Sequence, residues 1–364
     1  MSEERSCSVC GAAQEDLEVF EGQLLCPSCL EDRTCLCRRC GQRFWTDQNA
    51  GDEEQPLCPE CFEMYYTTCD ECGTLLPLGE VYYDEEDHAL CWTCYHRCQH
   101  SKLIQDYYYK PEPIFYGEGN RFFGVELEVD LGGEVNSKAL RLLKIPNGKE
   151  ERLYIKHDGS LDEGFELVSH PMTLEYHRQK MPWPELLTTA RELGYRSHQA
   201  PTCGLHVHVN RDAFGETEAE QDACIARVLY FFERNWEELL KFSRRTRRQL
   251  ERWADRYGYQ EHPREILEHA KKGCRGERYT CVNLQNEATV EFRIFRGTLK
   301  WNTFLATLQL VNRVCDVALY LSDQELKAMT WSSFAAGCQE LELVQYLKER
   351  RLYVNEPVET EEEV

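Results

Sequence analysis

The stretch FGVELEVD at residues 123–130 decides the fold of the larger part of this chain. Apolar and acidic residues alternate along it, and successive side chains of a β-strand point to opposite faces. The valines and the leucine are therefore expected to face a core. The acidic residues are expected on the other, polar face: Glu126, Glu128 and Asp130.

Three further stretches place charged or metal-binding groups on the same face. CGLHVHVN (203–210) contributes His206, His208 and Asn210, and ATVEFRIFRG (288–297) contributes Glu291 and Arg293. KHDGSLDEGFELVSHP (156–171) adds Asp158 and Glu166. Any one of these strands could be an ordinary half-exposed strand. Together they make a surface of carboxylates, two histidines and an arginine, which suits Mg²⁺ or Mn²⁺ bridging nucleotide phosphates.

The spacing of apolar residues predicts an α+β fold, with an antiparallel sheet covered by helices on one side. Strands are expected at 122–130, 153–157, 164–169, 204–210, 279–285 and 288–296. Helices are expected at 174–193, 217–256, 263–272, 301–321 and 339–351.

In this order, the motifs FGVELEVD, GFELVSHP, CGLHVHV and TVEFRIFRG resemble the amidoligase family, within the glutamine-synthetase-like carboxylate-amine ligases. The resemblance covers residues 107–321 and implies a glutamine-synthetase-like sheet. It also implies an ATP-dependent ligase that phosphorylates a carboxylate and lets an amine displace the phosphate. By this likeness Mg²⁺ or Mn²⁺ would be held by Glu126, Glu128, Glu166, His206 and Glu291. Nucleotide phosphate would meet His208, Arg293 and Arg296.

The chain has no match for the flap that closes the ammonia pocket of glutamine synthetase, so an amino acid or a peptide lysine is also expected as the amine. Two alternatives use the same residues. One is a phosphotransferase that stops at the phosphorylated product, and the other is an inactive adaptor built on a zinc scaffold.

Before this domain, a repeat of about 30 residues carries pairs of C-x-x-C motifs separated by 15 to 18 residues. Each pair can close a tetrahedron of thiolates around one Zn²⁺, and four protein ligands leave no open position for chemistry. Three structural zinc ions are therefore expected. The ligands are Cys7, Cys10, Cys26 and Cys29; Cys37, Cys40, Cys58 and Cys61; and Cys69, Cys72, Cys91 and Cys94.

Some details of the repeat stay open. Gly11, Gly41 and Gly73 each follow a knuckle and are expected at positive φ. Ligands could also interleave between neighbouring units. Five further residues could exchange with the ligands or be spectators: Cys35, Cys98, His88, His96 and His100.

Two features of the larger domain have a structural and a functional interpretation. Cys203 is expected to be a packed, inert thiol rather than a nucleophile. A basic run is expected on one solvated helix face, or alternatively as a dock for an acidic partner: Lys241, Arg244, Arg245, Arg247, Arg248, Arg252 and Arg256.

The charge composition limits which classes of partner the chain can bind. The chain has 364 residues and a formal net charge of −22, and its first hundred residues carry six Arg, no Lys and 21 acidic residues. Nucleic acid is therefore an unlikely partner, and a protein partner is expected, alongside carboxylate and amine substrates that could be peptides. No signal sequence or membrane span is recognised, which favours a cytoplasmic protein with reduced thiols. The expected domains are zinc ribbons (1–100), a linker (101–120), the amidoligase-like domain (121–352) and an acidic tail (353–364).

Overall fold

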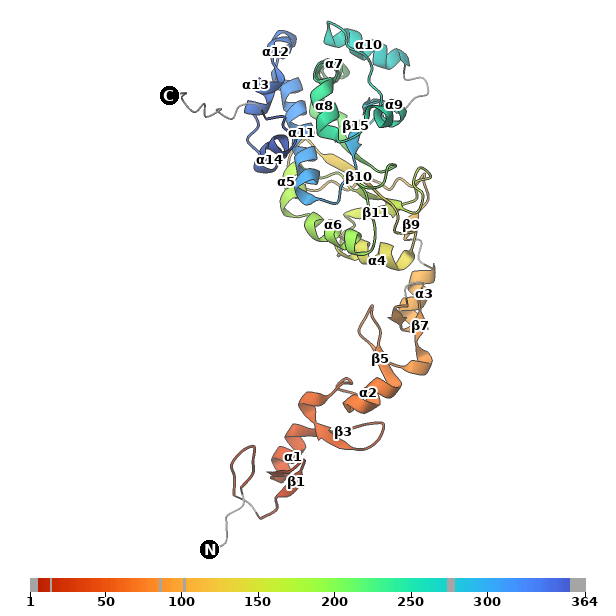
Figure 1. Ribbon diagram of the computed structural model, residues 1–364, viewed down its shortest axis with the longest axis vertical. Coiled ribbons are helices and arrows are strands. Elements are labelled where there is room, and N and C mark those ends of the chain that lie inside the picture. The colour runs from red at the N-terminus through yellow and green to blue at the C-terminus, as the bar shows by residue number, and fades with distance from the viewer. Residues whose placement is uncertain (1–5, 14, 85–86, 101–102, 274–278, 354–364) are drawn as a thin grey trace, which may run out of the picture. The chain divides into compact units, whose positions relative to one another are not determined.

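The computed structural model describes residues 6–13, 15–84, 87–100, 103–273 and 279–353, without side-chain detail at 97–100 and 273. The chain divides into two compact units, Met1–Ser101 and Lys102–Val364 (Figure 1). The side chains of Cys98 and His100 lie outside the described residues, as does the expected tail beyond Tyr353. No helix in the described ranges has the length and apolar character needed to cross a membrane.

The N-terminal unit repeats a small hairpin followed by a helix. The first repeat contains β1 (Glu18–Phe20), β2 (Gln23–Leu25) and α1 (Pro27–Arg33). The second repeat contains β3 (Thr34–Leu36), β4 (Arg43–Trp45), η1 (Thr46–Gln48) and α2 (Pro59–Tyr65). The third holds β5 (Tyr66–Thr68), β6 (Leu75–Pro77), η2 (Leu78–Glu80), β7 (Tyr82–Tyr83), β8 (Ala89–Leu90) and α3 (Trp92–His100). Each helix begins directly after the third cysteine of its quartet.

The knuckle glycines adopt the conformation expected from the sequence. Gly11, Gly41 and Gly73 have φ of 74°, 73° and 73°. Each donates its backbone N–H to the carbonyl of the first cysteine of its knuckle, at 2.8 to 2.9 Å. A side chain at positive φ is unfavourable, so the repeat uses glycine where the chain turns around the sulfur atoms.

The C-terminal unit is built on a seven-stranded sheet in the part of the chain that the structure describes, with the order β14-β15-β13-β10-β12-β11-β9. The strands are β9 (Ile104–Gln105), β10 (Phe123–Val129), β11 (Leu153–Lys156), β12 (Phe165–Ser169), β13 (Gly204–Asn210), β14 (Val282–Asn283) and β15 (Thr289–Arg296). The six predicted strands form and pair antiparallel, as expected. β9 comes from the segment expected to be a linker and pairs parallel with β11, which the sequence did not predict.

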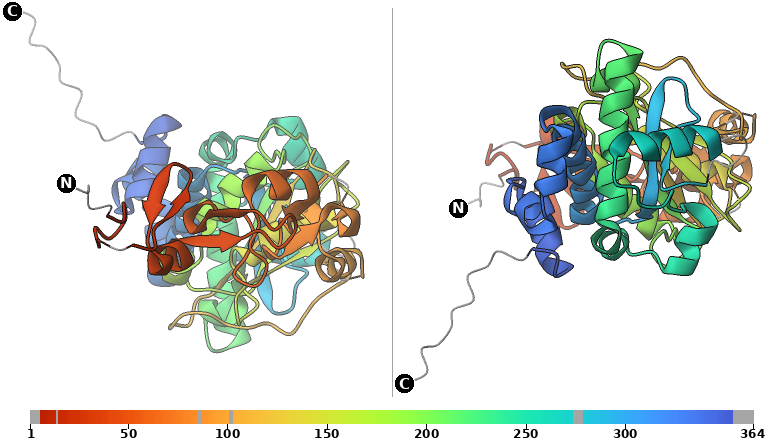
Figure 2. Two further views of the ribbon diagram at one scale, coloured as in Figure 1. Left: turned by 90° about the horizontal axis from the view of Figure 1, so that it is seen from below. Right: turned by 90° about the horizontal axis from the view of Figure 1, so that it is seen from above.

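One face of this sheet is apolar, as the alternation predicts. Val125, Leu127, Val207 and Phe292 are fully buried there. They belong to one core with residues of α5 (Leu174–Gln179), α6 (Trp183–Glu192), α7 (Glu218–Arg234) and α11 (Trp301–Tyr320). Of these helices, α7 and α11 lie side by side (Figures 1 and 2). The core thus fixes the sheet and leaves its other face for polar groups.

Two of the predicted long helices are divided. The segment 174–193 breaks between α5 and α6, where Pro182 and Pro184 lack backbone N–H groups. The segment 217–256 becomes α7, α8 (Trp236–Ser243) and α9 (Arg247–Trp253). Asn235 leaves the helical conformation between α7 and α8, and Arg244 takes a left-handed conformation with φ of 64° that ends α8. The other predicted helices form as α10 (Pro263–Gly273), α11 and α14 (Leu341–Glu349). Four helical elements in the described part of the C-terminal unit were not predicted: α4 (Asn136–Lys144), η3 (Arg211–Phe214), α12 (Asp323–Ala328) and α13 (Trp331–Ala336).

Candidate active site

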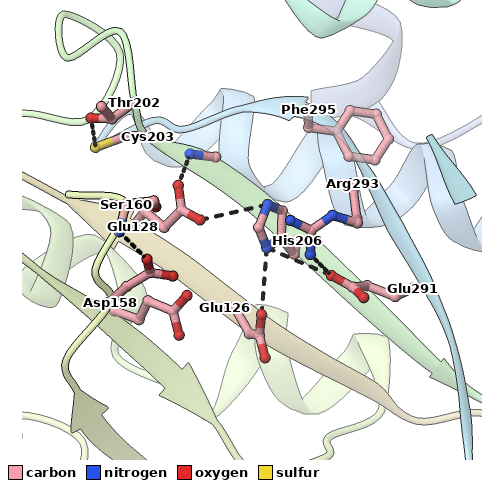
Figure 3. A network of polar contacts seen from close by, with 12 residues as sticks. Glu126, Glu128, Asp158, Ser160, Thr202, Cys203, His206, Glu291, Arg293 and Phe295 are labelled. Carbon is pink, nitrogen blue, oxygen red and sulfur yellow. Dashed lines mark hydrogen bonds and ion pairs between the residues drawn. The ribbon is translucent and has the colours of Figure 1, made fainter. Parts of the chain in front are cut away.

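Strand register brings the polar residues of four strands together. Glu126 on β10 lies opposite His206 on β13, and Glu128 lies opposite Glu166 on β12. His208 on β13 lies opposite Glu291 on β15. These pairs come from segments more than 30 residues apart in the sequence. Figure 3 shows four of their members, Glu126, Glu128, His206 and Glu291, close together.

The first metal-capable group is Glu126, His206 and Glu291, whose ligand atoms lie within 4.8 Å of one another. His206 Nδ1 is 3.4 Å from Glu126 Oε2 and 3.7 Å from Glu291 Oε1. His208 Nε2 approaches Glu126 Oε1 at 3.5 Å, and its Nδ1 lies 3.2 Å from Thr289 Oγ1. Two carboxylates and two imidazoles therefore converge on one point of the sheet.

The second group is Glu128, Asp158 and Glu166, again with ligand atoms within 4.8 Å. Asp158 comes from the loop after β11 and accepts a hydrogen bond from the Ser160 backbone at 2.6 Å. His206 Nε2 is 3.7 Å from Glu128 Oε1, so this ring lies between the two groups (Figure 3). Glu128 Oε2 also accepts the backbone N–H of Gly204.

The polar face is buried rather than open to solvent. Glu128 is 4% exposed and Glu291 is 3% exposed. The loop that carries Asp158 and the chain around Tyr107 and Tyr108 border this face. Burial matters because charges removed from water interact more strongly with one another and with any bound cation.

The surroundings shift the pKa values of the carboxyl groups in opposite directions. Burial raises the pKa of Glu166 well above its usual range, and repulsion from Glu126 adds to the shift. Burial also opposes ionisation of Glu126, but the neighbouring His208 and His206 outweigh it and hold the pKa of Glu126 well below its usual range. The pKa of His208 is raised, since Glu126 and Glu291 outweigh the effect of its burial. The site thus holds buried charges of both signs close together.

Three residues beside the carboxylates were not identified from the sequence. Lys156 Nζ lies 3.1 Å from Glu166 Oε2, and Asn283 donates to Glu291 Oε2 at 2.8 Å. Lys156 directly follows the buried Ile155 on β11. Because successive side chains of a strand point to opposite faces, this position alone could have placed Lys156 on the polar face. Arg293, which was predicted, is paired with Glu291.

Arg245 is the third, and it corrects the interpretation of the basic run. The break at Arg244 turns both arginines away from a solvated helix face. Arg245 is only 8% exposed, and its Nε donates to the Phe295 carbonyl at 3.3 Å. Burial lowers the pKa of Arg245 to about 10, against the attraction of Glu128. A cation therefore lies buried near the second carboxylate group.

Several candidates are placed away from the cluster. Asp130 accepts backbone hydrogen bonds from Leu131, Asp162 and Glu163, so it anchors a loop. Asn210 bonds the backbone at Phe122 and Asn120. Arg296, at the end of β15, lines neither of the cavities beside the cluster.

Cys203 is buried, and its burial raises the thiol pKa well above the usual range. The packed, inert thiol that was expected fits this environment.

Two cavities meet at the cluster. A polar one of about 280 Å³ is lined by carboxylates of both groups, though not by Glu128, and by Lys156, Arg293 and Lys110. An apolar one of about 330 Å³ is lined by aromatic residues and prolines that include Tyr109, Phe115, Phe122 and Tyr154. The two share Lys110, Glu126, Lys156, His208 and Asn286. A ligand with an apolar and an anionic part could occupy both.

The donor set fits a divalent cation that prefers oxygen ligands. Each group offers two or three carboxylates within reach of a single ion. His208 Nε2 is buried and has no hydrogen-bond partner within the described ranges. An oxygen of a bound phosphate could accept a hydrogen bond from this nitrogen.

The cysteine quartets fit zinc on geometric grounds. Within each quartet the sulfur atoms lie within 4.8 Å of one another. The Cys10–Cys26, Cys40–Cys58 and Cys72–Cys91 sulfur pairs are 3.7, 3.9 and 3.9 Å apart. A tetrahedral zinc with Zn–S bonds of about 2.3 Å requires sulfur atoms about 3.8 Å apart. All four ligands of a set come from one repeat unit, so the sets do not interleave.

Two of the remaining candidates are engaged elsewhere. His88 Nδ1 contacts Asp84 Oδ2 at 3.0 Å, and the His96 ring packs against Trp92. Neither these histidines nor Cys35 belongs to a quartet among the residues that the structure describes.

A buried face of carboxylates and histidines beside two cavities is typical of enzymes that bind charged substrates together with divalent cations. Residues 144–315 match the family model described as "Putative amidoligase enzyme", which confirms the resemblance to the amidoligase family over this segment. The match includes Glu166, His206, His208, Glu291 and Arg293, and it begins after the first carboxylate strand. It supports an amide-bond-forming ligase as the general class.

Among solved structures, the chain is similar to a crystal structure of a bifunctional glutathione synthetase from Pasteurella multocida. Its sequence identity is 16% and its TM-score is 0.34, over 64% of this chain and 46% of that one. The chain thus spans less than half the length of that protein, and the likeness is too low to carry an argument. No curated protein sequence matches this chain.

Proposed function

We propose that residues 121–352 form an ATP-dependent carboxylate-amine ligase that makes an amide or isopeptide bond through an acyl phosphate. The observation that carries the proposal is the cross-strand convergence of Glu126, Glu128 and Glu166 with His206 and Glu291. The antiparallel sheet with one polar face is also what a glutamine-synthetase-like architecture would require.

In the proposed reaction, a substrate carboxylate oxygen attacks the γ-phosphorus of ATP and ADP leaves. The amine nitrogen then attacks the acyl carbon, phosphate leaves, and the amine loses a proton. Mg²⁺ or Mn²⁺ held by the two carboxylate groups would neutralise the anions as they approach.

The cavities suggest how the nucleotide lies. The apolar cavity with Tyr109, Phe115 and Tyr154 would take the adenine ring. The phosphates would then extend past Lys110 and Lys156, which line both cavities, toward His208 and Arg293. Arg293 already pairs with Glu291, so a phosphoryl group would meet a guanidinium that is held in position.

Hydroxylamine tests the proposal, because this small nucleophile intercepts acyl phosphates. The protein is incubated with ATP, Mg²⁺, pooled carboxylic acids and hydroxylamine, and products are analysed by mass spectrometry. A hydroxamate with stoichiometric ADP and phosphate supports the ligase. A stable phosphorylated product on a hydroxyl or guanidino group would instead establish the phosphotransferase, and no ATP turnover with any acid would favour the inactive adaptor.

We also propose that the zinc module recruits a protein substrate or partner. Its support is the combination of acidic charge with exposed apolar side chains, such as Met64 at 62% and Trp92 at 56%. Met64→Glu should raise KM for a macromolecular substrate and leave kcat unchanged. Equal KM values for the variant and the wild type would contradict this role.

A further inference from the structure

A third cavity of about 370 Å³ lies in the C-terminal unit and is lined by cations. Arg191 at the end of α6, Arg196, Arg244 and Lys300 contribute side chains, and no carboxylate lines it. All three cavities lie in the C-terminal unit. None of the residues that line this cavity lines either of the two cavities at the carboxylate cluster. It is therefore a separate feature of the fold, and its positive charge is notable in a chain with net charge −22.

The arginines of this cavity lack acidic partners. Within the described residues, Arg191, Arg196 and Arg244 form no ion pair with a carboxylate, while Lys300 pairs with Glu349 at 3.2 Å. Arg196 instead donates to the Tyr195 carbonyl at 2.7 Å. Like charges gathered around one cavity repel one another, so the arrangement is most stable when an anion occupies it.

Arg244 is held in place by its surroundings. Its Nη2 donates to the Arg296 carbonyl at 2.9 Å and its Nη1 lies 3.1 Å from His198 Nδ1, but its buried Nε has no hydrogen-bond partner within the described ranges. The residue has φ of 64°, a conformation that non-glycine residues adopt at a cost. These two contacts hold the guanidinium of Arg244 beside the cavity that it lines.

The positive charge around this cavity also affects the pKa of His198. Burial lowers its pKa, and the charges of Arg244, Arg296 and Arg350 lower it further. Since Nδ1 faces a guanidinium donor, the neutral ring carries its proton on Nε2 and can donate it to an anion.

The start of α11 adds a favourable dipole. This 20-residue helix begins at Trp301, has no acidic residue in its first turn, and its N-cap Lys300 makes no side-chain capping bond. Thr303 in that first turn lines the cavity. Free backbone N–H groups and the positive end of a long helix stabilise a bound anion.

From these observations together, we propose that this cavity is a binding site for a multiply charged oxyanion, either a phosphate group or a cluster of carboxylates on a small molecule. The site is independent of the proposed ligase reaction. Its volume is within the range of small-molecule sites and exceeds what a lone inorganic ion fills.

The test is calorimetric titration of the full-length protein, without added Mg²⁺, using pyrophosphate in one arm and citrate in the other. Saturable binding of one equivalent of either probe is expected, and the tighter probe identifies the ligand chemistry. Arg191→Gln should weaken binding by about tenfold or more, since each charge-assisted contact contributes strongly. Arg191 is exposed, so this variant should fold, and Arg244→Gln should act in the same direction.

Two control variants locate the bound anion. Arg248→Gln removes the same charge from an exposed position on α9 and should leave the affinity unchanged. Arg293→Gln, in the carboxylate cluster, should also leave it unchanged. The proposal is overturned if neither probe binds saturably, if Arg293→Gln abolishes binding while Arg191→Gln retains it, or if Arg248→Gln weakens binding as much as Arg191→Gln.

Discussion

Glu126 and His206 are direct cross-strand partners on β10 and β13, with 3.4 Å between Glu126 Oε2 and His206 Nδ1. The two residues are 80 positions apart in the sequence. This pair lies at the centre of the carboxylate cluster. Glu128 and His208 each lie two residues further along these strands, so the same register places them on the same face. The proposed chemistry depends on this register.

Glu128→Gln should lower ATP turnover by at least about 100-fold, because it removes a charged ligand from the second group but keeps an acceptor for Gly204 N–H. Steady-state ADP release at saturating Mg²⁺ measures this. Glu192→Gln, at an exposed position of α6, is the matched control and should be fully active. A fully active Glu128→Gln enzyme would mean that the strand is an ordinary polar face.

The purified protein should contain about three zinc ions per chain. Cys37→Ser should release one of them and unfold the middle unit, because metal binding and folding are coupled in small zinc units. Cys35→Ser is the matched control, since Cys35 lies two residues away but outside the quartets, and it should retain all three. Metal analysis after purification without chelator decides the outcome, and one zinc or none in the wild type would contradict the prediction.

Stability should fall between about pH 6.5 and pH 4 because of His177. This buried ring lies 2.9 Å from the Phe123 carbonyl through Nε2 and accepts the Trp183 indole N–H through Nδ1. Burial lowers its pKa from 6.5 to about 4. The folded state thus favours the neutral ring, and its contribution is complete above pH 6.5 and lost as the pH falls toward 4.

At pH 5 the loss from this group should be about 2 kcal/mol relative to neutral pH. Urea unfolding of the wild type and of His177→Gln at pH 7.5 and pH 5 measures it. The variant should be less stable at pH 7.5 but should lose about 2 kcal/mol less on acidification. Parallel losses in the two proteins would show that other groups account for the pH dependence.

Asp130→Ala should destabilise the C-terminal unit by about 3 kcal/mol. Asp130 is buried and accepts hydrogen bonds from three backbone N–H groups and from Thr202 Oγ1, and the substitution would remove the acceptor of all four part-buried bonds. Asp130→Asn retains one acceptor oxygen and should lose less. A shift of the urea midpoint measures both, and equal stability of Asp130→Ala and wild type would contradict the anchoring role.

The sequence alone determined the local features of this protein. Alternation in FGVELEVD and CGLHVHVN set which side chains share a face, because the period of a strand is two residues. The C-x-x-C spacing determined the zinc quartets in the same way, since the ligands of each are local to one repeat. These features need no information about distant parts of the chain.

The tertiary structure decided what depends on contacts between distant segments. Lys156 and Arg245 join the cluster only because β11 pairs with the carboxylate strand β12 and the junction between α8 and α9 packs beside Glu128. Burial of that face also could not be read from alternation, which is the same for a solvated strand and for one covered by loops. The register that pairs Glu126 with His206 likewise depends on the packing of their apolar neighbours, Leu127 and Leu205, against the helices. Packing between distant segments therefore turned a predicted polar face into a buried, highly charged site.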